Sequence, residues 1–281
     1  MKKVSIVIPT YNRDKLLLNA LNSIVKQTYS NLEVVIVDDF STDNTQLYVS
    51  SFEGLNIVYY PLEKNLGYIK ARNIGIQIAT GDYISFLDSD DSILPHKIEL
   101  LVNKAGEEKT DLVYAGWRWM NFETGKIRVE RKPDEFGLIN SLPRWCYNVV
   151  PDLVDANIMK QLSFNIEASN NENLDFFIRM AQLKKSSFVC EVLSEYRDHQ
   201  GARESSNLLG MIAGLEFIVS QHLDFIKNQK YWLSEKYLSL AIMIKKTNGD
   251  INKRNHYFLK SVIHRPFYLR NWAHWLFSFF R

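Results

Sequence analysis

Three apolar runs near the start of the chain each end in a cluster of polar or acidic side chains. These clusters begin at Thr10, Asp38 and Asp88. Segments with helical spacing of apolar residues separate the runs. Strands that alternate with helices predict a mostly parallel sheet covered on both faces. Because ligands of such sheets bind where the strands end, the sequence predicts an α/β fold with an acidic binding site at one edge.

The periodicity of the apolar residues predicts the remaining elements. We expect strands at residues 4–8, 33–37, 56–60, 83–87 and 111–115. We expect helices at residues 14–26, 68–79, 95–105, 173–184, 208–226, 231–245 and over most of 255–280. Thr124 and Gly125 predict the turn of a hairpin, whereas residues 134–151 and 157–171 are interpreted as loops.

Charge divides the chain unevenly. The net charge is +2, yet residues 244–281 carry eight Lys or Arg against the single acid Asp250, which leaves −5 for the rest. With 281 residues and 46% hydrophobic content, the chain can bury a substantial core. We expect one domain over residues 1–206, with halves at 1–115 and 116–206, and a basic, aromatic-rich helical region at 207–281.

The sequence also indicates a compartment. No run of about 18 uncharged apolar residues occurs, and the first apolar run is too short for a signal peptide. Cys146 and Cys190 lack the spacing of a metal site and suit a reducing environment. We therefore expect a cytoplasmic protein that does not bind nucleic acid.

The acidic cluster at residues 88–91 has the chemistry of a metal site. Mg²⁺ and Mn²⁺ take oxygen ligands, usually one or two carboxylates together with phosphate oxygens. Asp88 and Asp90 lie two residues apart at a strand end and could both reach one metal-bound diphosphate. Such a metal would stabilise the negative charge on a departing phosphate.

Two further groups are compatible with a nucleotide. Asp39 ends the second predicted strand, where an acid can bind a ribose or a base, whereas Asp38 equally fits a turn residue. No GxGxxG loop follows the first strand, so the pyrophosphate cradle of a dinucleotide enzyme is not expected. Lys70 and Arg72 could face a nucleotide or could be solvated helix charges.

These motifs, in this order, resemble the inverting nucleotide-sugar glycosyltransferases of family 2. The matching stretches are SIVIPTYNR at 5–13, VVIVDDFSTDN at 34–44, NLG at 65–67, ARNIG at 71–75 and GDYISFLDSDD at 81–91. The resemblance implies a Rossmann-like GT-A fold and Mn²⁺ or Mg²⁺ at the DxD carboxylates. It also implies a UDP-type donor and transfer to a glycan or glycolipid hydroxyl, as in the synthesis of surface polysaccharides.

The resemblance also implies the members of the site. The nucleotide-binding residues would be Pro9, Thr10, Tyr11, Arg13, Asp39, Asn65, Gly67, Arg72, Asp88 and Ser89. The metal ligands would be Asp88, Asp90 and His199, the last from the segment YRDH at 196–199.

A second block, ENLDFFIR at 172–179, is similar to the Glu-Asp element of the family. The Asp of that pair acts in relatives as the general base, but this chain has Asn173 there, and a carboxamide does not accept a proton usefully. We favour Glu172 as the base because its longer side chain recovers reach. Asp91 is the other catalytic candidate, although a nearby cation would lower its pKa and make it a poor base.

Two alternatives remain open at this point. A phosphatase of the haloacid dehalogenase type also uses an Asp pair, but after its first strand, whereas this pair follows the fourth. Asn173 alternatively favours a non-catalytic protein that binds a nucleotide sugar or a partner enzyme. The chain lacks a QxxRW element, so we expect transfer of one sugar per encounter.

The C-terminal tail has a basic and amphipathic pattern. Apolar residues recur at helical spacing at Leu259, Val262, Ile263, Leu269, Trp272, Leu276 and Phe279. Polar residues fall on another face at Lys260, His264, Asn271, His274, Ser278 and Arg281, with a break at Pro266. Residues 258–281 therefore predict either peripheral contact with an anionic membrane, at its inner face, or a helix packed on the domain.

Overall fold

The computed structural model describes residues 1–131, 150–183, 185–197 and 207–277. Its contacts divide the chain into two compact units. The first consists of Met1–Phe164 and Phe176–Gly201, and the second of Asn165–Asp175 and Ala202–Arg281. Cys146 and His199 lie outside the described residues.

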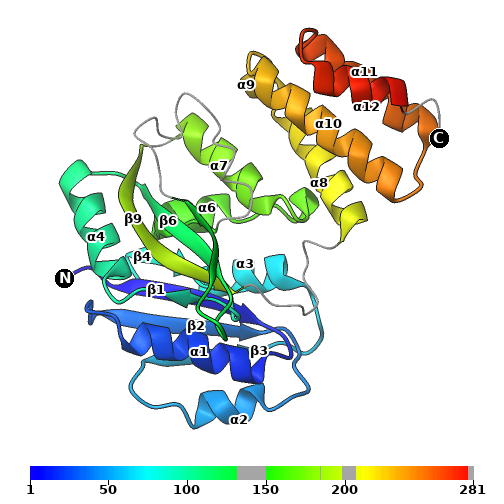
Figure 1. The fold of residues 1–281 in the computed structure, drawn as a ribbon. Coiled ribbons are helices and arrows are strands. Elements are labelled where there is room, and N and C mark those ends of the chain that lie inside the picture. Colours follow the sequence, from blue (N-terminus) through cyan, green and yellow to red (C-terminus); the bar gives the residue numbers. More distant parts are fainter. Residues whose placement is uncertain (132–149, 184, 198–206, 278–281) are drawn as a thin grey trace. The chain divides into compact units, whose positions relative to one another are not determined.

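The first unit is built on a nine-stranded mixed sheet (Figure 1). The spatial order is β3-β2-β1-β4-β8-β6-β9-β5, and β7 pairs with β6. The strands are β1 (Val4–Thr10), β2 (Leu32–Asp38), β3 (Ile57–Pro61), β4 (Tyr83–Phe86), β5 (Ser92–Ile93), β6 (Leu112–Met120), β7 (Ile127–Arg131), β8 (Leu153–Asp155) and β9 (Ser186–Arg197). The hairpin predicted around Thr124 and Gly125 is confirmed as the β6–β7 pair.

The strands that precede the polar clusters are neighbours and parallel. β1 pairs with β2 on one side and with β4 on the other. In this register Thr10 lies opposite Asp38, and the amide of Leu87 donates to the carbonyl of Val7 over 3.1 Å. The carboxyl ends of the three strands therefore meet at one edge, as the sequence predicts.

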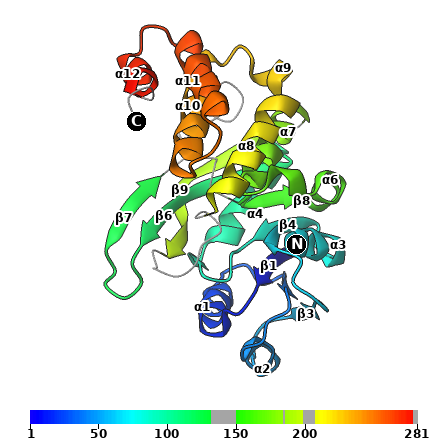
Figure 2. The same cartoon turned by 90° about the vertical axis from the view of Figure 1, so that its right-hand side faces the viewer.

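Helices cover both faces of this sheet. They are α1 (Asp14–Val25), α2 (Thr45–Ser50), α3 (Tyr68–Ile78), α4 (Lys97–Glu108), α6 (Ala156–Leu162) and α7 (Glu172–Leu183), of which α7 begins in the second unit. Alternation along β1 sorts its side chains, because Val4, Ile6 and Ile8 pack with α1 and α4, whereas Val7 packs with α3 and α6. Figure 2 shows α1 and α3 on opposite sides of β1.

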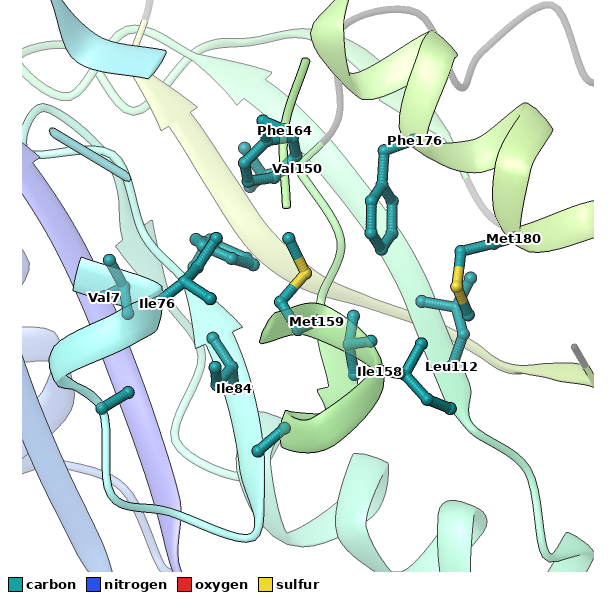
Figure 3. Close-up of a cluster of buried hydrophobic side chains, with 14 of the residues drawn as sticks. Val7, Ile76, Ile84, Leu112, Val150, Ile158, Met159, Phe164, Phe176 and Met180 are labelled. Carbon is teal, nitrogen blue, oxygen red and sulfur yellow. The ribbon is translucent and has the colours of Figure 1, made fainter. Parts of the chain in front are cut away.

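One apolar cluster joins the parallel half of the sheet to the second half. Figure 3 shows Val7 and Ile76 approaching Met159, with Phe164 and Phe176 on the far side. The rings of Phe164 and Phe176 have centroids 5.5 Å apart. This packing holds α6 and the apolar side of α7 against the sheet.

Three predictions about the first unit are wrong. Residues 157–171 are not all loop, because α6 begins at Ala156, where the Asp155 carboxylate caps the amides of Asn157 and Ile158 at 3.0 and 3.2 Å. β8 and β9 were not predicted at all. The helix after Pro95 starts two residues later than expected, at Lys97.

The second unit is helical in its described part. Its helices are α8 (Leu208–Gln221), α9 (Leu223–Ile226), α10 (Lys230–Lys246), α11 (Ile251–His264), α12 (Leu269–Phe277) and the short 3₁₀ helix Ile166–Ala168. The single helix predicted at 208–226 is wrong, since it breaks at His222. That imidazole turns to the Asp175 carboxylate, with Nε2 2.8 Å from Oδ1.

The predicted amphipathic tail needs a correction. The break at Pro266 is confirmed between α11 and α12, but Asn271, placed on the polar face, is fully buried. Its amide nitrogen donates to Ser234 Oγ over 2.7 Å and to the carbonyl of Ser261 over 3.0 Å, which satisfies both of its N–H donors inside the unit. Among the described residues, no helix is long and apolar enough to cross a membrane.

Candidate functional site

Three carboxylates crowd the turn that follows β4. Asp88, Asp90 and Asp91 lie within one turn, closed by the Asp91 amide donating to the Asp88 carbonyl over 3.0 Å. Burial, followed by the negative charges of Asp90 and Asp88, raises the pKa of Asp91 well above its ordinary value. The effect of a bound cation on this pKa stays a prediction.

Two arginines offset part of this charge. Arg13, in the loop after β1, pairs with Asp90 at 2.8 Å, and Arg72, on α3, pairs with Asp88 at 2.5 Å. Arg72 is buried, and its guanidinium lies 5.1 Å from the Tyr68 ring centroid and 5.7 Å from that of Phe164. Both arginines thus point towards the acidic turn, where anionic phosphate oxygens would meet positive charge.

Asp39 organises the loop that precedes α3. Its carboxylate accepts the amides of Leu66 at 2.6 Å and Gly67 at 2.8 Å, and its carbonyl accepts Asn65 Nδ2 at 3.2 Å. Gly67 has φ +88°, a conformation that other residues rarely adopt. The structure therefore brings Asp39, Asn65 and Gly67 together, as the predicted nucleotide site requires.

Asp38 has a structural role beside it. Its carboxylate accepts the hydroxyl of Tyr59 at 2.5 Å and the amide of Ser41 at 2.8 Å. Burial and this hydrogen bond raise the pKa of Tyr59. The alternative of a turn residue, left open by the sequence, is the one that the contacts of Asp38 support.

Thr10, at the carboxyl end of β1, lies between the ends of β2 and β4. The carbonyl of Thr10 accepts the Asp39 amide at 2.8 Å, while its buried Oγ1 finds no hydrogen-bond partner among the described residues. A buried hydroxyl left in this state favours a ligand that supplies the missing bond. Pro9 and Ser89 are buried, whereas the Tyr11 side chain is 46% exposed and open to a ligand.

The sequence prediction missed Arg197 at the end of β9. Its amide donates to Asp91 Oδ1 over 3.0 Å, its Nε donates to the Asp90 carbonyl over 3.3 Å, and its guanidinium lies 4.1 Å from the Phe122 ring centroid. Arg197 therefore ties the β6–β7 hairpin to the acidic turn. The signal was present in the segment YRDH, where only the histidine was considered.

The neighbouring Tyr196 completes an aromatic wall. Its ring stacks on Trp117 with centroids 5.4 Å apart, and Trp119 lies 5.8 Å from Trp117. Burial, then the negative charges of Asp152, Asp91 and Asp88, raise the pKa of Tyr196 well above its ordinary value. This hydroxyl therefore stays protonated beside the acidic turn.

The residues present suit a divalent cation shared with a substrate. Within the described ranges, no three His, Cys, Asp or Glu side chains are arranged to enclose a metal alone. Asp88 and Asp90 instead offer two carboxylates within one turn, each paired with an arginine in this structure. Two carboxylates with phosphate oxygens are the usual protein site for Mg²⁺.

Glu172 and Asn173 open α7 in the second unit. Both are buried, at 4% and 7% exposed, and the Asn173 Oδ1 has no hydrogen-bond partner among the described residues. Asp175, three residues on, binds His222 as described above and holds the start of α7 to α8 and α9. The role of Glu172 stays a prediction.

Comparisons with known proteins agree on one family. The model described as "Glycosyl transferase family 2" matches residues 5–165. The Rickettsia typhi protein described as uncharacterized glycosyltransferase RT0329 is 28% identical over 266 residues, which span 88% of this chain and 81% of that protein. Escherichia coli WfgD, named a UDP-Glc:alpha-D-GlcNAc-diphosphoundecaprenol beta-1,3-glucosyltransferase, is 28% identical over 212 residues, spanning 72% and 80%.

A solved structure shares the fold. Residues 1–349 of Staphylococcus aureus TarS, crystallised in complex with UDP-GlcNAc, align with a TM-score of 0.71 and 23% identity. The alignment covers 92% of this chain and 81% of that one. The likeness confirms the predicted GT-A architecture of a mostly parallel sheet with a helical C-terminal region.

Proposed function

The chain belongs to glycosyl transferase family 2 and is a glycosyltransferase, and from this premise we propose which reaction it performs. It moves one sugar from a UDP-sugar to a hydroxyl of a glycan or a lipid-linked glycan, with inversion at the anomeric carbon. The setting is the synthesis of a surface polysaccharide. Membership of this family excludes the phosphatase alternative, and the activity of its named relatives argues against a purely non-catalytic role.

The observation that carries the proposal is the convergence at the carboxyl edge of β1, β2 and β4. Thr10, Asp39 and Asp88 come from three neighbouring strand ends, and Arg13 and Arg72 face the acidic turn from two sides. A diphosphate needs positive charge and hydrogen-bond donors, whereas a base needs a buried polar partner. This edge provides both within one surface.

Asp88 and Asp90 would hold Mn²⁺ or Mg²⁺ together with the donor diphosphate, and His199 would add a ligand from outside the described residues. When bound, the cation offsets the negative charge that builds on the leaving diphosphate. Arg13 and Arg72, now paired with these carboxylates, would turn part of their hydrogen bonding to the phosphates. Asp39 would accept the N3–H of the uracil ring.

Inversion requires one in-line displacement, so a base must take the proton of the acceptor hydroxyl as the new bond forms. We assign this role to Glu172, a buried carboxylate at the first residue of α7. Asn173, whose Oδ1 is left without a partner, would orient the acceptor by accepting a hydrogen bond. Asp91 is the second candidate, although a cation held by Asp88 and Asp90 would lower its pKa and weaken it as a base.

The substrate class draws support from two relatives. WfgD is named for a UDP-sugar donor and an acceptor linked to diphosphoundecaprenol, and TarS was crystallised with UDP-GlcNAc. In the aromatic wall, the partly exposed rings of Trp119 and Tyr196 would offer flat apolar surfaces of the kind on which sugar rings pack.

A donor panel tests the proposal. UDP-, GDP- and dTDP-sugars would be incubated with the full chain, Mn²⁺ and a lipid-diphosphate sugar acceptor, and NMR would report the anomeric configuration of the product. We expect one UDP-sugar to be consumed only with the divalent cation and to give the inverted linkage. Equal turnover with EDTA, or retention of configuration, would overturn the proposal.

A further inference from the structure

The corner between α11 and α12 carries three apolar side chains that face solvent. Ile263 lies in the last turn of α11, Phe267 in the connection and Leu269 at the start of α12. Their exposed fractions are 63%, 98% and 81%. Apolar surface gathered at one exposed site marks a place where a partner gains free energy by covering it.

This corner is well packed on its inner side. Asn271 is fully buried and donates to Ser234 of α10 and to the carbonyl of Ser261 of α11, which fixes the start of α12 to both helices. Trp272 Nε1 donates to the carbonyl of Pro266 over 2.6 Å and closes the connection. The three exposed apolar side chains therefore belong to a well-packed part of the second unit.

The surroundings of the corner are basic and aromatic. Lys260, Arg265 and Arg270 lie in or next to the corner, and residues 251–277 contain no Asp or Glu. The Arg265 guanidinium lies 4.2 Å from the Tyr231 ring centroid and 3.9 Å from that of Tyr268. Arg270 is exposed next to Leu269. Glu235, 3.5 Å from Arg265, is the acid that faces this group.

We propose that this corner docks the protein on an anionic phospholipid surface. Ile263, Phe267 and Leu269 would enter the boundary between headgroups and acyl chains, while the tyrosines and Trp272 would sit at headgroup depth. The basic excess complements lipid phosphates and is worth about 1 kcal/mol per residue near such a surface. A second copy of this corner would bring the same positive charge, which disfavours self-association as its use.

The chain offers a matched pair of substitutions for the test. Ile263 and Ile251 both lie on α11, are 63% and 61% exposed, and stand 12 positions apart, which is about 18 Å along a helix. Ile263→Glu and Ile251→Glu change the net charge equally, but only the first places the charge at the corner. Phe267→Ala removes the most exposed ring without adding a charge.

Co-sedimentation of the full chain with vesicles measures the binding. We expect wild type to bind vesicles that contain phosphatidylglycerol, to bind pure phosphatidylcholine weakly and to lose binding as salt increases. Ile263→Glu should weaken binding by at least about tenfold, and Phe267→Ala should weaken it several-fold. Ile251→Glu should bind within about twofold of wild type.

Several results would overturn the proposal. These are no binding of wild type to anionic vesicles, equal losses for Ile263→Glu and Ile251→Glu, or a vesicle-free dimer that Phe267→Ala dissociates in sedimentation velocity. Circular dichroism melting checks that each variant is folded. Because no donor or acceptor is present in these measurements, the outcome does not depend on the proposed function.

Discussion

The two ends of β1, β2 and β4 both bury carboxylates, but in opposite electrostatic states. At the amino end, Glu33 is 3% exposed and surrounded by donors. At the carboxyl end, Asp91 is 9% exposed and has Asp88 and Asp90 as neighbours. The same chemical group is therefore surrounded by donors at one edge and has two like charges beside it at the other.

The donors around Glu33 come from three segments. Its oxygens accept Lys3 Nζ at 2.5 Å, Ser5 Oγ at 2.7 Å and the Thr80 hydroxyl and amide at 2.6 and 2.9 Å. Burial alone would raise the pKa of Glu33. The hydrogen bonds together outweigh burial and lower this pKa to about 2. A carboxylate bonded this completely has no capacity left for a ligand.

The pKa of Asp91 shifts in the opposite direction, as is common for carboxylates in binding sites. Carboxylates held close together cost stability in the empty protein, and a cation or a cation-bound substrate recovers that free energy. The carboxylates that cost stability here lie at the edge where ligands of open sheets bind. We therefore expect that removing the charge of Glu33 destabilises the fold, whereas removing the charge of Asp91 stabilises it.

The largest expected effect is the loss of turnover in Asp90→Asn. Removing one of two cation ligands should lower kcat by a factor of at least about 10⁴, because the charge on the leaving diphosphate is no longer offset. The control is Asp82→Asn at the amino end of β4, where the carboxylate pairs with Lys2 at 2.9 Å. Equal losses in the two variants would break the comparison.

Glu172→Gln should be the next largest effect. If Glu172 is the base, kcat should fall by about 10²–10⁴ while UDP binding is unchanged. Asn173→Asp should be tolerated, since it restores a carboxylate at that position. Wild-type turnover by Glu172→Gln on the true acceptor would move the base to another residue, with Asp91 the first to examine.

Glu33→Gln should destabilise the fold without touching the site. It replaces charge-assisted bonds inside the protein, and we expect a loss of about 2–3 kcal/mol in the free energy of unfolding. Because the pKa of Glu33 is lowered, its stabilisation is present above its ordinary value of 4.5 and is lost as the pH falls towards 2. Denaturant melts from pH 6 to pH 2 should show a flatter acid dependence in the variant, and an unchanged dependence would contradict the assignment.

Asp39→Ala should discriminate between ligands. Losing a hydrogen bond to a charged acceptor costs about 2 kcal/mol, so UDP should bind about 30-fold more weakly while pyrophosphate changes little. Calorimetry with both ligands measures the ratio. Parallel losses would mean that Asp39 acts only through the loop that it holds at Leu66 and Gly67.

The smallest effect should have the opposite sign. Asp91→Asn keeps the shape and the bond from the Arg197 amide while removing one of three like charges. In the cation-free protein we expect the melting temperature to rise by about 2–4 °C, equivalent to about 1 kcal/mol. The gain should grow as the pH rises from 4, because an acid with a raised pKa destabilises the fold more as it ionises. A lower melting temperature would contradict the comparison.

Local sequence was enough for the parallel half of the sheet. There each strand is an apolar run, each helix lies next to it in the chain, and the polar residues follow directly at Thr10, Asp38 and Asp88. The second half depends on distant partners. β9 pairs with β6 more than 70 residues earlier, and β8 has only three residues, so neither shows a period of its own.

The residues of the site also differ in whether the local sequence could predict them. Asp39, Arg72 and Asp90 could be predicted because their motifs are contiguous. Arg197 was missed because its link to the acidic turn depends on β9, and the burial of Asn271 depends on three helices meeting. In both cases tertiary contacts decide the role of a residue whose local pattern suggests another.

The most direct test of the comparison is the affinity of the wild-type chain for UDP with and without Mn²⁺. If Asp88 and Asp90 bind a cation together with UDP, calorimetry at neutral pH should show that UDP binds at least about tenfold more tightly with Mn²⁺ than with EDTA. Asp90→Asn should abolish that difference, and Glu33→Gln should keep it. Equal UDP affinity in wild type with Mn²⁺ and with EDTA would contradict the account.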